Sequence, residues 1–162
     1  MKKILIIIIP FFMSCSQSTN PLETRDFNLK FSYGVNARNI LNTFQNTYTK
    51  DLIVDGVITI PFTLSNNDFK QILDKMNEIK IFEYPDTFVV PTWDTTTTII
   101  PFSTYKFEVS YNSSIKYLYW SDNIINANNN ATKLRELIKL LTRIIQSKPE
   151  YLQLPPAKGG YL

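Results

Sequence analysis

The chain's only cysteine, Cys15, constrains the fold more than any other residue, because a single thiol cannot form a disulfide within the chain. Stability must therefore come from a packed apolar core, even in an oxidising compartment. Cys15 follows two lysines and the uncharged run Ile4–Met13. That run is too short to cross a bilayer as a helix, which takes about 20 apolar residues, and Pro10 interrupts it. We therefore expect residues 1–14 to be a signal peptide that is removed.

The four residues Phe12-Met13-Ser14-Cys15 resemble the lipobox, the cleavage and lipidation motif of bacterial lipoproteins. The resemblance implies that Cys15 becomes an N-terminus carrying acyl chains such as palmitate, so that the membrane is reached through this lipid. Two or more acyl chains hold a protein on a membrane, whereas one does so only marginally. We expect a membrane-anchored protein of the cell envelope with its domain outside the cytoplasm. The alternative is an ordinary secretory signal followed by a free cysteine.

The composition excludes several kinds of chemistry. The chain contains no histidine, which removes the commonest general base, the Ser–His and Cys–His pairs, and histidine-based metal sites. The formal net charge of +3 includes Lys2 and Lys3, so the mature chain is close to neutral and gives no electrostatic case for nucleic acid. Asp51 and Asp55 match no defined calcium loop, and we interpret them as part of a turn. No cofactor and no metal site is predicted.

The chain divides into a leader, a tether, a domain and a tail. Residues 15–25 are polar and read as a tether, and a chain of this length suits one domain, which we place at residues 26–148. Residues 149–162 form a tail with several prolines and glycines, which we expect to be extended or mobile.

Alternation of apolar and polar residues predicts five strands. Pro61 has no N–H to donate to a neighbour, so the strand that contains it is expected at an edge of the sheet. The predicted strands are residues 27–33, 40–49, 58–64, 105–111 and 115–120, with a turn at 50–56 and a long loop or irregular edge at 88–101.

Helical spacing of apolar residues predicts two helices. The first begins at Ser65, whose hydroxyl can cap the helix, with Asp68 three residues later as in a capping box. The second runs from about Ala131 to Ser147 and is stopped by Pro149. Strands joined by short links and helices kept separate indicate an α+β fold. We predict an antiparallel sheet of about five strands with two amphipathic helices on one face.

The register of the last two strands is open from the sequence, because residues 112–114 allow two turns. A three-residue turn brings Tyr117 and Tyr119 beside the apolar side chains of the preceding strand. A two-residue turn brings Leu118 and Trp120 there instead. Both arrangements give an aromatic face.

Both faces of residues 115–120 carry bulky rings, and tyrosine and tryptophan combine a large contact area with a polar group. We expect one face to stay exposed and to bind a partner, an envelope protein or a glycan. The candidate binding residues are Trp93, Tyr117, Tyr119 and Trp120. The alternative is that the tail or Trp93 covers the second face, which would place those rings in the core.

Several short stretches in the first half of the mature chain are similar to an uncharacterised group of small secreted or lipid-anchored bacterial proteins. They are residues 31–34, 39–44 and 47–51, together with Leu64-Ser65 and Tyr84-Pro85. The resemblance implies no reaction and transfers no functional residue.

The sequence leads to the hypothesis of a non-enzymatic binding module in the cell envelope. One rival is a hydrolase that uses two carboxylates and no histidine, as glycosidases do. Nothing in the spacing of its candidate residues brings two of them together; they are Glu83, Asp86, Asp94, Glu108 and Asp122. The other rival is a structural accessory of an envelope complex, with no ligand of its own.

Overall fold

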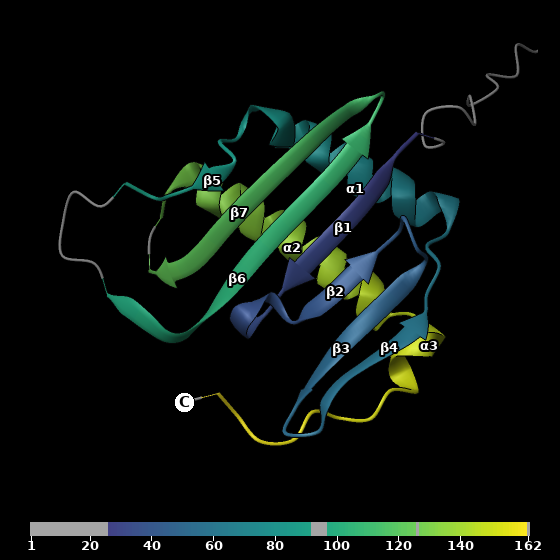
Figure 1. Cartoon of the computed structure of the whole chain (residues 1–162). Coiled ribbons are helices and arrows are strands. Elements are labelled where there is room, and N and C mark those ends of the chain that lie inside the picture. The colour runs from purple at the N-terminus through teal and green to yellow at the C-terminus, as the bar shows by residue number, and fades with distance from the viewer. Residues whose placement is uncertain (1–25, 92–96, 126, 162) are drawn as a thin grey trace, which may run out of the picture.

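The computed structural model describes residues 26–91, 97–125 and 127–161. They form an α+β fold with one seven-stranded sheet and three α-helices (Figure 1). The expected signal peptide, the tether, Cys15 and Trp93 lie outside the described residues. The strands are β1 Asn28–Tyr33, β2 Asn39–Asn42, β3 Thr47–Ile53, β4 Gly56–Pro61, β5 Thr87–Phe88, β6 Thr98–Tyr111 and β7 Ser114–Ile124. The helices are α1 Asn66–Glu78, α2 Asn129–Gln146 and α3 Pro149–Leu152.

The strands lie in the order β4-β3-β2-β1-β6-β7-β5. All neighbours pair antiparallel except β5, which runs parallel to β7. The predicted α+β class is confirmed, whereas the expected number of about five strands and a wholly antiparallel sheet are wrong. β5 has only two residues, which is too short to produce an alternating pattern in the sequence.

The predicted strand at residues 40–49 is in fact two strands joined by a tight turn. The Asn42 side chain accepts a hydrogen bond from the Phe44 backbone N–H at 3.1 Å, and Asn46 adopts a positive φ of 51°. Asparagine favours both of these turn conformations. The turn contains neither glycine nor proline, so nothing in the sequence marked a break and a single strand was predicted.

β4 is an edge strand, as Pro61 predicts. Pro61 lies opposite Thr47 of β3, and the backbone N–H of the next residue, Phe62, donates to the Asn46 carbonyl at 2.8 Å. In an antiparallel ladder, this pattern directs the nitrogen of Pro61 away from β3. The missing N–H therefore costs the sheet no hydrogen bond.

Helices α1 and α2 lie on the same face of the sheet, as predicted, and Figure 1 places both behind it. Their apolar side chains meet those of the sheet in one core, in which Leu29, Phe31, Ile72, Leu134 and Leu141 are fully buried. Burying a side chain of this kind stabilises the fold by about 1.5–3 kcal/mol. None of the helices in the described residues is both long and apolar enough to span a bilayer.

The start of α1 confirms the predicted capping box. The Asp68 backbone N–H donates to Ser65 Oγ at 3.2 Å, and the Ser65 backbone N–H donates to Asp68 Oδ2 at 2.7 Å. Each residue satisfies a backbone donor that the first turn of a helix leaves without a partner.

The β6–β7 hairpin turns at Asn112-Ser113, where both residues have positive φ values of 48° and 63°. Two such residues are typical of the two-residue turn that matches the twist of a hairpin. Phe107 lies opposite Leu118, and Tyr105 lies opposite Trp120. The two-residue turn that the sequence allowed was at Ser113-Ser114, so the observed turn is one residue earlier, but Leu118 and Trp120 face the core as in that alternative.

The expectation of an extended or mobile tail is wrong for Pro149–Leu152, which form the short helix α3. Pro149 ends α2 as predicted, yet it also begins the next helix, because proline suits the first turn of a helix. Beyond α3, the tail runs beside the end of β3. Lys158 forms backbone hydrogen bonds of 3.2 Å and 3.3 Å with Leu52 and Val54 there.

Candidate binding surface

One face of the sheet carries no α-helix of the described residues, and Figure 1 views the molecule from this side. Residues that lie directly opposite each other on neighbouring strands point to the same face. Tyr119 lies opposite Lys106, which lies opposite Ser32. We call this surface the open face and define it by Lys30, Ser32, Ile40, Lys106, Glu108, Tyr117, Tyr119 and Ser121.

Two of the four predicted binding residues lie on the open face. Tyr117 is 54% exposed and Tyr119 is 41% exposed, although most aromatic side chains of the described chain are buried or half-buried. The two rings belong to the same strand and stand two residues apart, so they are neighbours on one face of β7. Their role in binding stays a prediction, and Trp93 lies outside the described residues.

Trp120 is 1% exposed, so its placement on an exposed surface is wrong. Its ring packs against Phe88 and Tyr105, with centroids 5.7 Å and 5.5 Å apart, and the Arg135 guanidinium lies 5.3 Å from the ring centroid. Trp120 faces the core because, in the observed register of the hairpin, the even-numbered residues Leu118 and Trp120 of β7 point inward. The sequence had left this register open.

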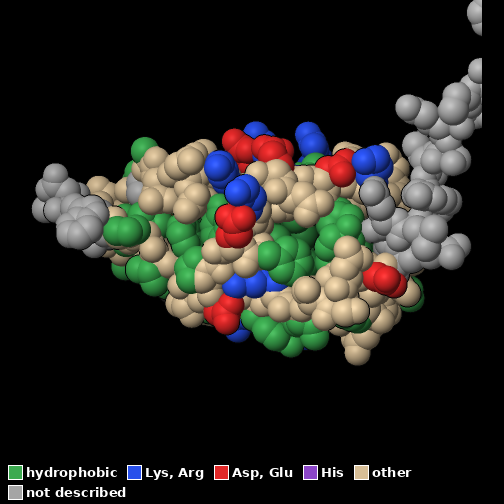
Figure 2. Space-filling model, turned by 90° about the horizontal axis from the view of Figure 1, so that it is seen from above, with side chains coloured by type: hydrophobic (Ala, Val, Ile, Leu, Met, Phe, Trp, Pro, Cys, Tyr) green, Lys and Arg blue, Asp and Glu red, His purple; other side chains and the backbone are tan. Residues whose placement is uncertain are grey.

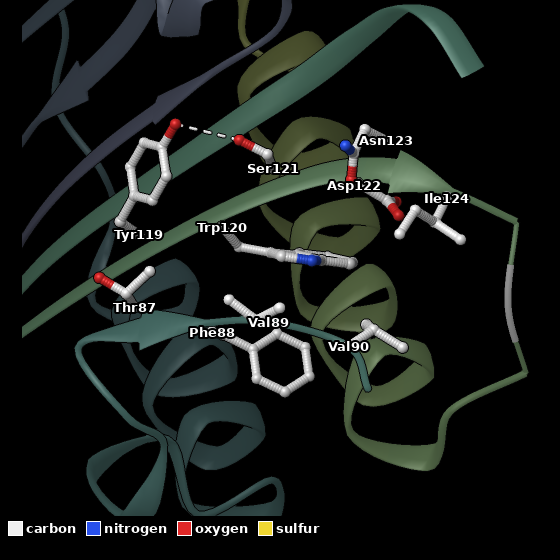
Figure 3. Close-up of a pocket in the computed structure, with 10 residues that line it drawn as sticks. All are labelled: Thr87, Phe88, Val89, Val90, Tyr119, Trp120, Ser121, Asp122, Asn123 and Ile124. Carbon is white, nitrogen blue, oxygen red and sulfur yellow. Dashed lines mark hydrogen bonds between the residues drawn. The ribbon is translucent and has the colours of Figure 1, made fainter. Parts of the chain in front are cut away.

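A hollow of about 270 Å³ lies where β5 ends beside β7, and residues 87–90 and 119–124 line it. Figure 3 shows Tyr119 and Ser121 on one side of β7, while Trp120 points the other way, toward Phe88. The hydroxyl groups of Tyr119 and Ser121 are 3.0 Å apart and share a hydrogen bond. This bond holds the Tyr119 ring along the strand.

A second hollow, of about 370 Å³, lies on the open face over β1 and β6. It combines aromatic and aliphatic side chains with several polar groups. Its lining includes Tyr117, Ile40, Ala37, Ser32, Lys30, Lys106 and Glu108. Tyr117 therefore borders one hollow and Tyr119 borders the other.

The charges of the open face nearly cancel. Lys30 lies directly opposite Glu108, which leaves Lys106 as the remaining charge among the residues that define the face. On the upper side of the molecule, which Figure 2 shows instead of the open face, basic and acidic side chains lie next to one another. The residues that define the open face therefore form no basic patch or stripe of the kind that polyanions bind.

Three of the four described candidate carboxylates of a hydrolase each contact a basic side chain. Glu83 contacts Lys80 at 3.3 Å and Asp86 contacts Lys116 at 2.6 Å. Asp122 accepts hydrogen bonds from Arg135 on both oxygens, at 2.8 Å and 2.6 Å, and these bonds raise the pKa of Arg135 above its ordinary value. Glu108 lies alone among the carboxylates of the open face, and Asp94 lies outside the described residues.

The turn assignment of Asp51 and Asp55 needs one correction. Asp51 belongs to β3 and is buried, where its carboxylate contacts Arg38 at 3.6 Å and accepts a hydrogen bond from Tyr161. Asp55 lies in the β3–β4 turn and contacts Lys158 at 2.9 Å. Within residues 26–91, 97–125 and 127–161, no three acidic, cysteine or histidine side chains are grouped as metal ligands.

Reasoning from the sequence missed the polar part of the open face. Lys30, Ser32, Lys106 and Glu108 alternate with core residues on two strongly patterned strands, so their outward direction was readable. What the sequence did not reveal is that β1 and β6 are neighbours, which brings the four side chains beside Tyr117.

Comparisons with known proteins add no further constraint. No family model, no curated protein and no solved structure matches this chain.

Proposed function

We propose that this chain is a lipid-anchored protein of the cell envelope that binds another envelope component through the open face. The observation that carries the proposal is the pair Tyr117 and Tyr119, two exposed rings side by side on a sheet face that no described α-helix covers. Tyrosine is enriched at binding surfaces because its ring gives contact area at low conformational cost while its hydroxyl remains able to hydrogen-bond.

The lipid anchor is supported by the leader of the sequence. Two lysines, an uncharged run and the motif ending in Cys15 suit export followed by acylation. The polar residues 16–25 then separate the acyl chains from β1. Fully extended, ten residues reach at most about 35 Å, so the open face works close to the membrane.

A binding role is favoured over hydrolysis by the state of the carboxylates. A pair that runs glycoside hydrolysis must face the scissile bond from two sides. Glu83, Asp86 and Asp122 are each engaged by a cation of the protein, and Glu108 has no described acidic neighbour on the open face.

The anchor is tested by fractionating cells that produce the full chain or Cys15→Ser. The wild-type protein is expected in the membrane fraction, with a mass that includes the acyl chains on Cys15. The Cys15→Ser protein is expected to leave that fraction. A wild-type protein with an intact, unacylated N-terminus would contradict the anchor.

The binding role is tested by placing a photo-crosslinking amino acid at position 117 in intact cells. The matched control carries the same amino acid at Phe82, an exposed aromatic residue outside the open face. We expect a crosslinked envelope component at 117 that is absent at 82 and is lost when Tyr119→Ala is added. Equal labelling at both positions would contradict a role for the open face.

A further inference from the structure

Building on the proposed function, we infer that the component bound by the open face is a glycan strand of the cell wall, held by Tyr117 and Tyr119. The inference rests on the chemistry of the two rings and of the two hollows beside them.

The rings suit the flat apolar side of a sugar. The C–H groups on one side of a pyranose carry a slight positive charge, and the face of an aromatic ring is negative. Tyr119 is held by its hydrogen bond to Ser121, and Tyr117 stands next to it on the same strand. A ring that is already fixed loses little conformational freedom when a ligand stacks on it.

The larger hollow suits an N-acetylated sugar better than a simple one. Its ammonium and hydroxyl groups, from Lys30, Lys106 and Ser32, can donate to an acetamido carbonyl. The Glu108 carboxylate can accept from the amide N–H or from a ring hydroxyl. Ile40 supplies an apolar surface for the acetyl methyl group.

The charge of the open face suits a neutral chain. The opposite charges of Lys30 and Glu108, which face each other across β1 and β6, cancel most of the local electrostatic field. A strongly anionic or strongly cationic polymer is therefore attracted only weakly. Lone charged groups that donate or accept hydrogen bonds can still fix the orientation of a neutral ligand.

A protein partner fits the open face less well. The fully buried centre of a protein interface is mostly apolar and depleted of charged residues. Here Lys30, Lys106, Glu108 and Ser32 lie between Ile40 on β2 and the tyrosines on β7, so no continuous apolar patch forms. The polar groups would have to be desolvated to seat a protein, whereas hydroxyl and acetamido groups can pair with them.

The experiment is co-sedimentation of the full-length protein, in mild detergent, with purified cell-wall sacculi, together with chitohexaose as a soluble N-acetylated competitor. The wild-type protein is expected to sediment with the sacculi and to be released by chitohexaose. Tyr117→Ala and Tyr119→Ala are each expected to weaken binding about tenfold or more. Tyr117→Phe keeps the ring and is expected to bind as the wild type does.

Phe82→Ala is the matched control, because it removes an exposed ring outside the open face and should leave sedimentation unchanged. Melting temperatures of the two alanine variants well above the temperature of the assay would assign the loss to binding rather than to folding. Absence of sedimentation by the wild-type protein would overturn the inference, as would full sedimentation of both alanine variants.

The outcome separates the inference from the proposed function on which it rests. Suppose that position 117 crosslinks to another protein, that Tyr119→Ala abolishes this crosslink, and that the wild-type chain does not sediment with sacculi. This result would overturn the glycan as ligand and keep the binding role. A chain that neither sediments with sacculi nor crosslinks at 117 would overturn both.

Discussion

The Lys148 ammonium contacts the same oxygen of Asp68 that closes the capping box of α1. The contact joins the start of the first helix to the residue between α2 and α3, 80 positions later in the chain. Desolvation alone would raise the pKa of Asp68, but the hydrogen bonds from Lys148 and Ser65 outweigh it and hold that pKa below its ordinary value of 3.8.

Asp68→Asn is expected to lower the free energy of unfolding at neutral pH by about 1.5–3 kcal/mol, the range for hydrogen bonds to a charged group. Because the pKa of Asp68 is lowered on folding, its contribution is complete above the unfolded value and is lost as pH falls below about 4. Urea unfolding at several pH values should therefore show the gap between wild type and variant closing in acid. Asp74→Asn, which removes an exposed pair with Lys70, should change stability by less than about 0.5 kcal/mol.

Trp120→Ala should be among the most damaging single substitutions, because the indole is buried between Phe88 and Tyr105. We expect a loss of about 3–5 kcal/mol, the usual cost of emptying a large aromatic site. Tyr119→Ala, one residue earlier and exposed, should cost at most about 1 kcal/mol, the span of strand propensities. Chemical unfolding of the two variants checks the assignment, and similar losses for both would contradict the register of β7.

Tyr33 and Tyr48 place their hydroxyl oxygens 2.7 Å apart at the margin of the core. Burial is the main cause that raises the pKa of both groups above 10.0, to about 12 for Tyr33. Folding thus favours the neutral phenols, so their contribution is complete below about pH 10 and is lost as pH rises toward 12.

Tyr33→Phe should lower stability at neutral pH by about 1 kcal/mol, because the Tyr48 hydroxyl loses its partner. The variant no longer carries the titration of Tyr33, so its stability should fall less steeply in alkali than that of the wild type. Unfolding titrations near neutral pH and at about pH 11 should show the two proteins converging. Parallel curves would count against the buried hydroxyl pair.

Gly159 should matter more than its neighbour Gly160. Gly159 has a φ of +85°, and a Cβ added there would lie 2.9 Å from a methyl carbon of Val54, whereas a Cβ at Gly160 meets nothing within 4 Å. Gly159→Ala is expected to loosen the tail from β3 by about 1 kcal/mol, while Gly160→Ala is close to neutral. Hydrogen exchange at the Val54 amide, which donates to Lys158, reports this directly. Equal exchange rates in both variants would show that the tail holds β3 in some other way.

Much of the fold was readable because local chemistry and the final structure agree. The cap at Ser65, the helical spacing that follows it and the missing donor of Pro61 each act over a few residues, so a pattern can detect them. The turn after Asn42 was missed because asparagine side-chain bonds, rather than glycine or proline, reverse the chain. β5 was missed because its parallel pairing with Tyr119 and Trp120 depends on a tertiary contact.

The candidate surface was half readable for a related reason. Alternation fixes which residues share a face of a strand, but it does not say which face meets the helices. Both faces of β7 carry aromatic rings, so hydrophobicity alone could not separate Tyr119 from Trp120. The two-residue turn at Asn112-Ser113 settles the choice, whereas a three-residue turn would move the pairing by one residue and exchange the two faces.

The place of β1 in the sheet has a mechanical consequence. The chain enters the fold at β1, which is bonded to β2 along one edge and to β6 along the other. Any tension applied through the N-terminal segment therefore acts on an interior strand, and both ladders share the load instead of one outer strand being peeled away. If Cys15 carries the proposed lipid anchor, a pull on that anchor would therefore be resisted by the hydrogen bonds on both edges of β1.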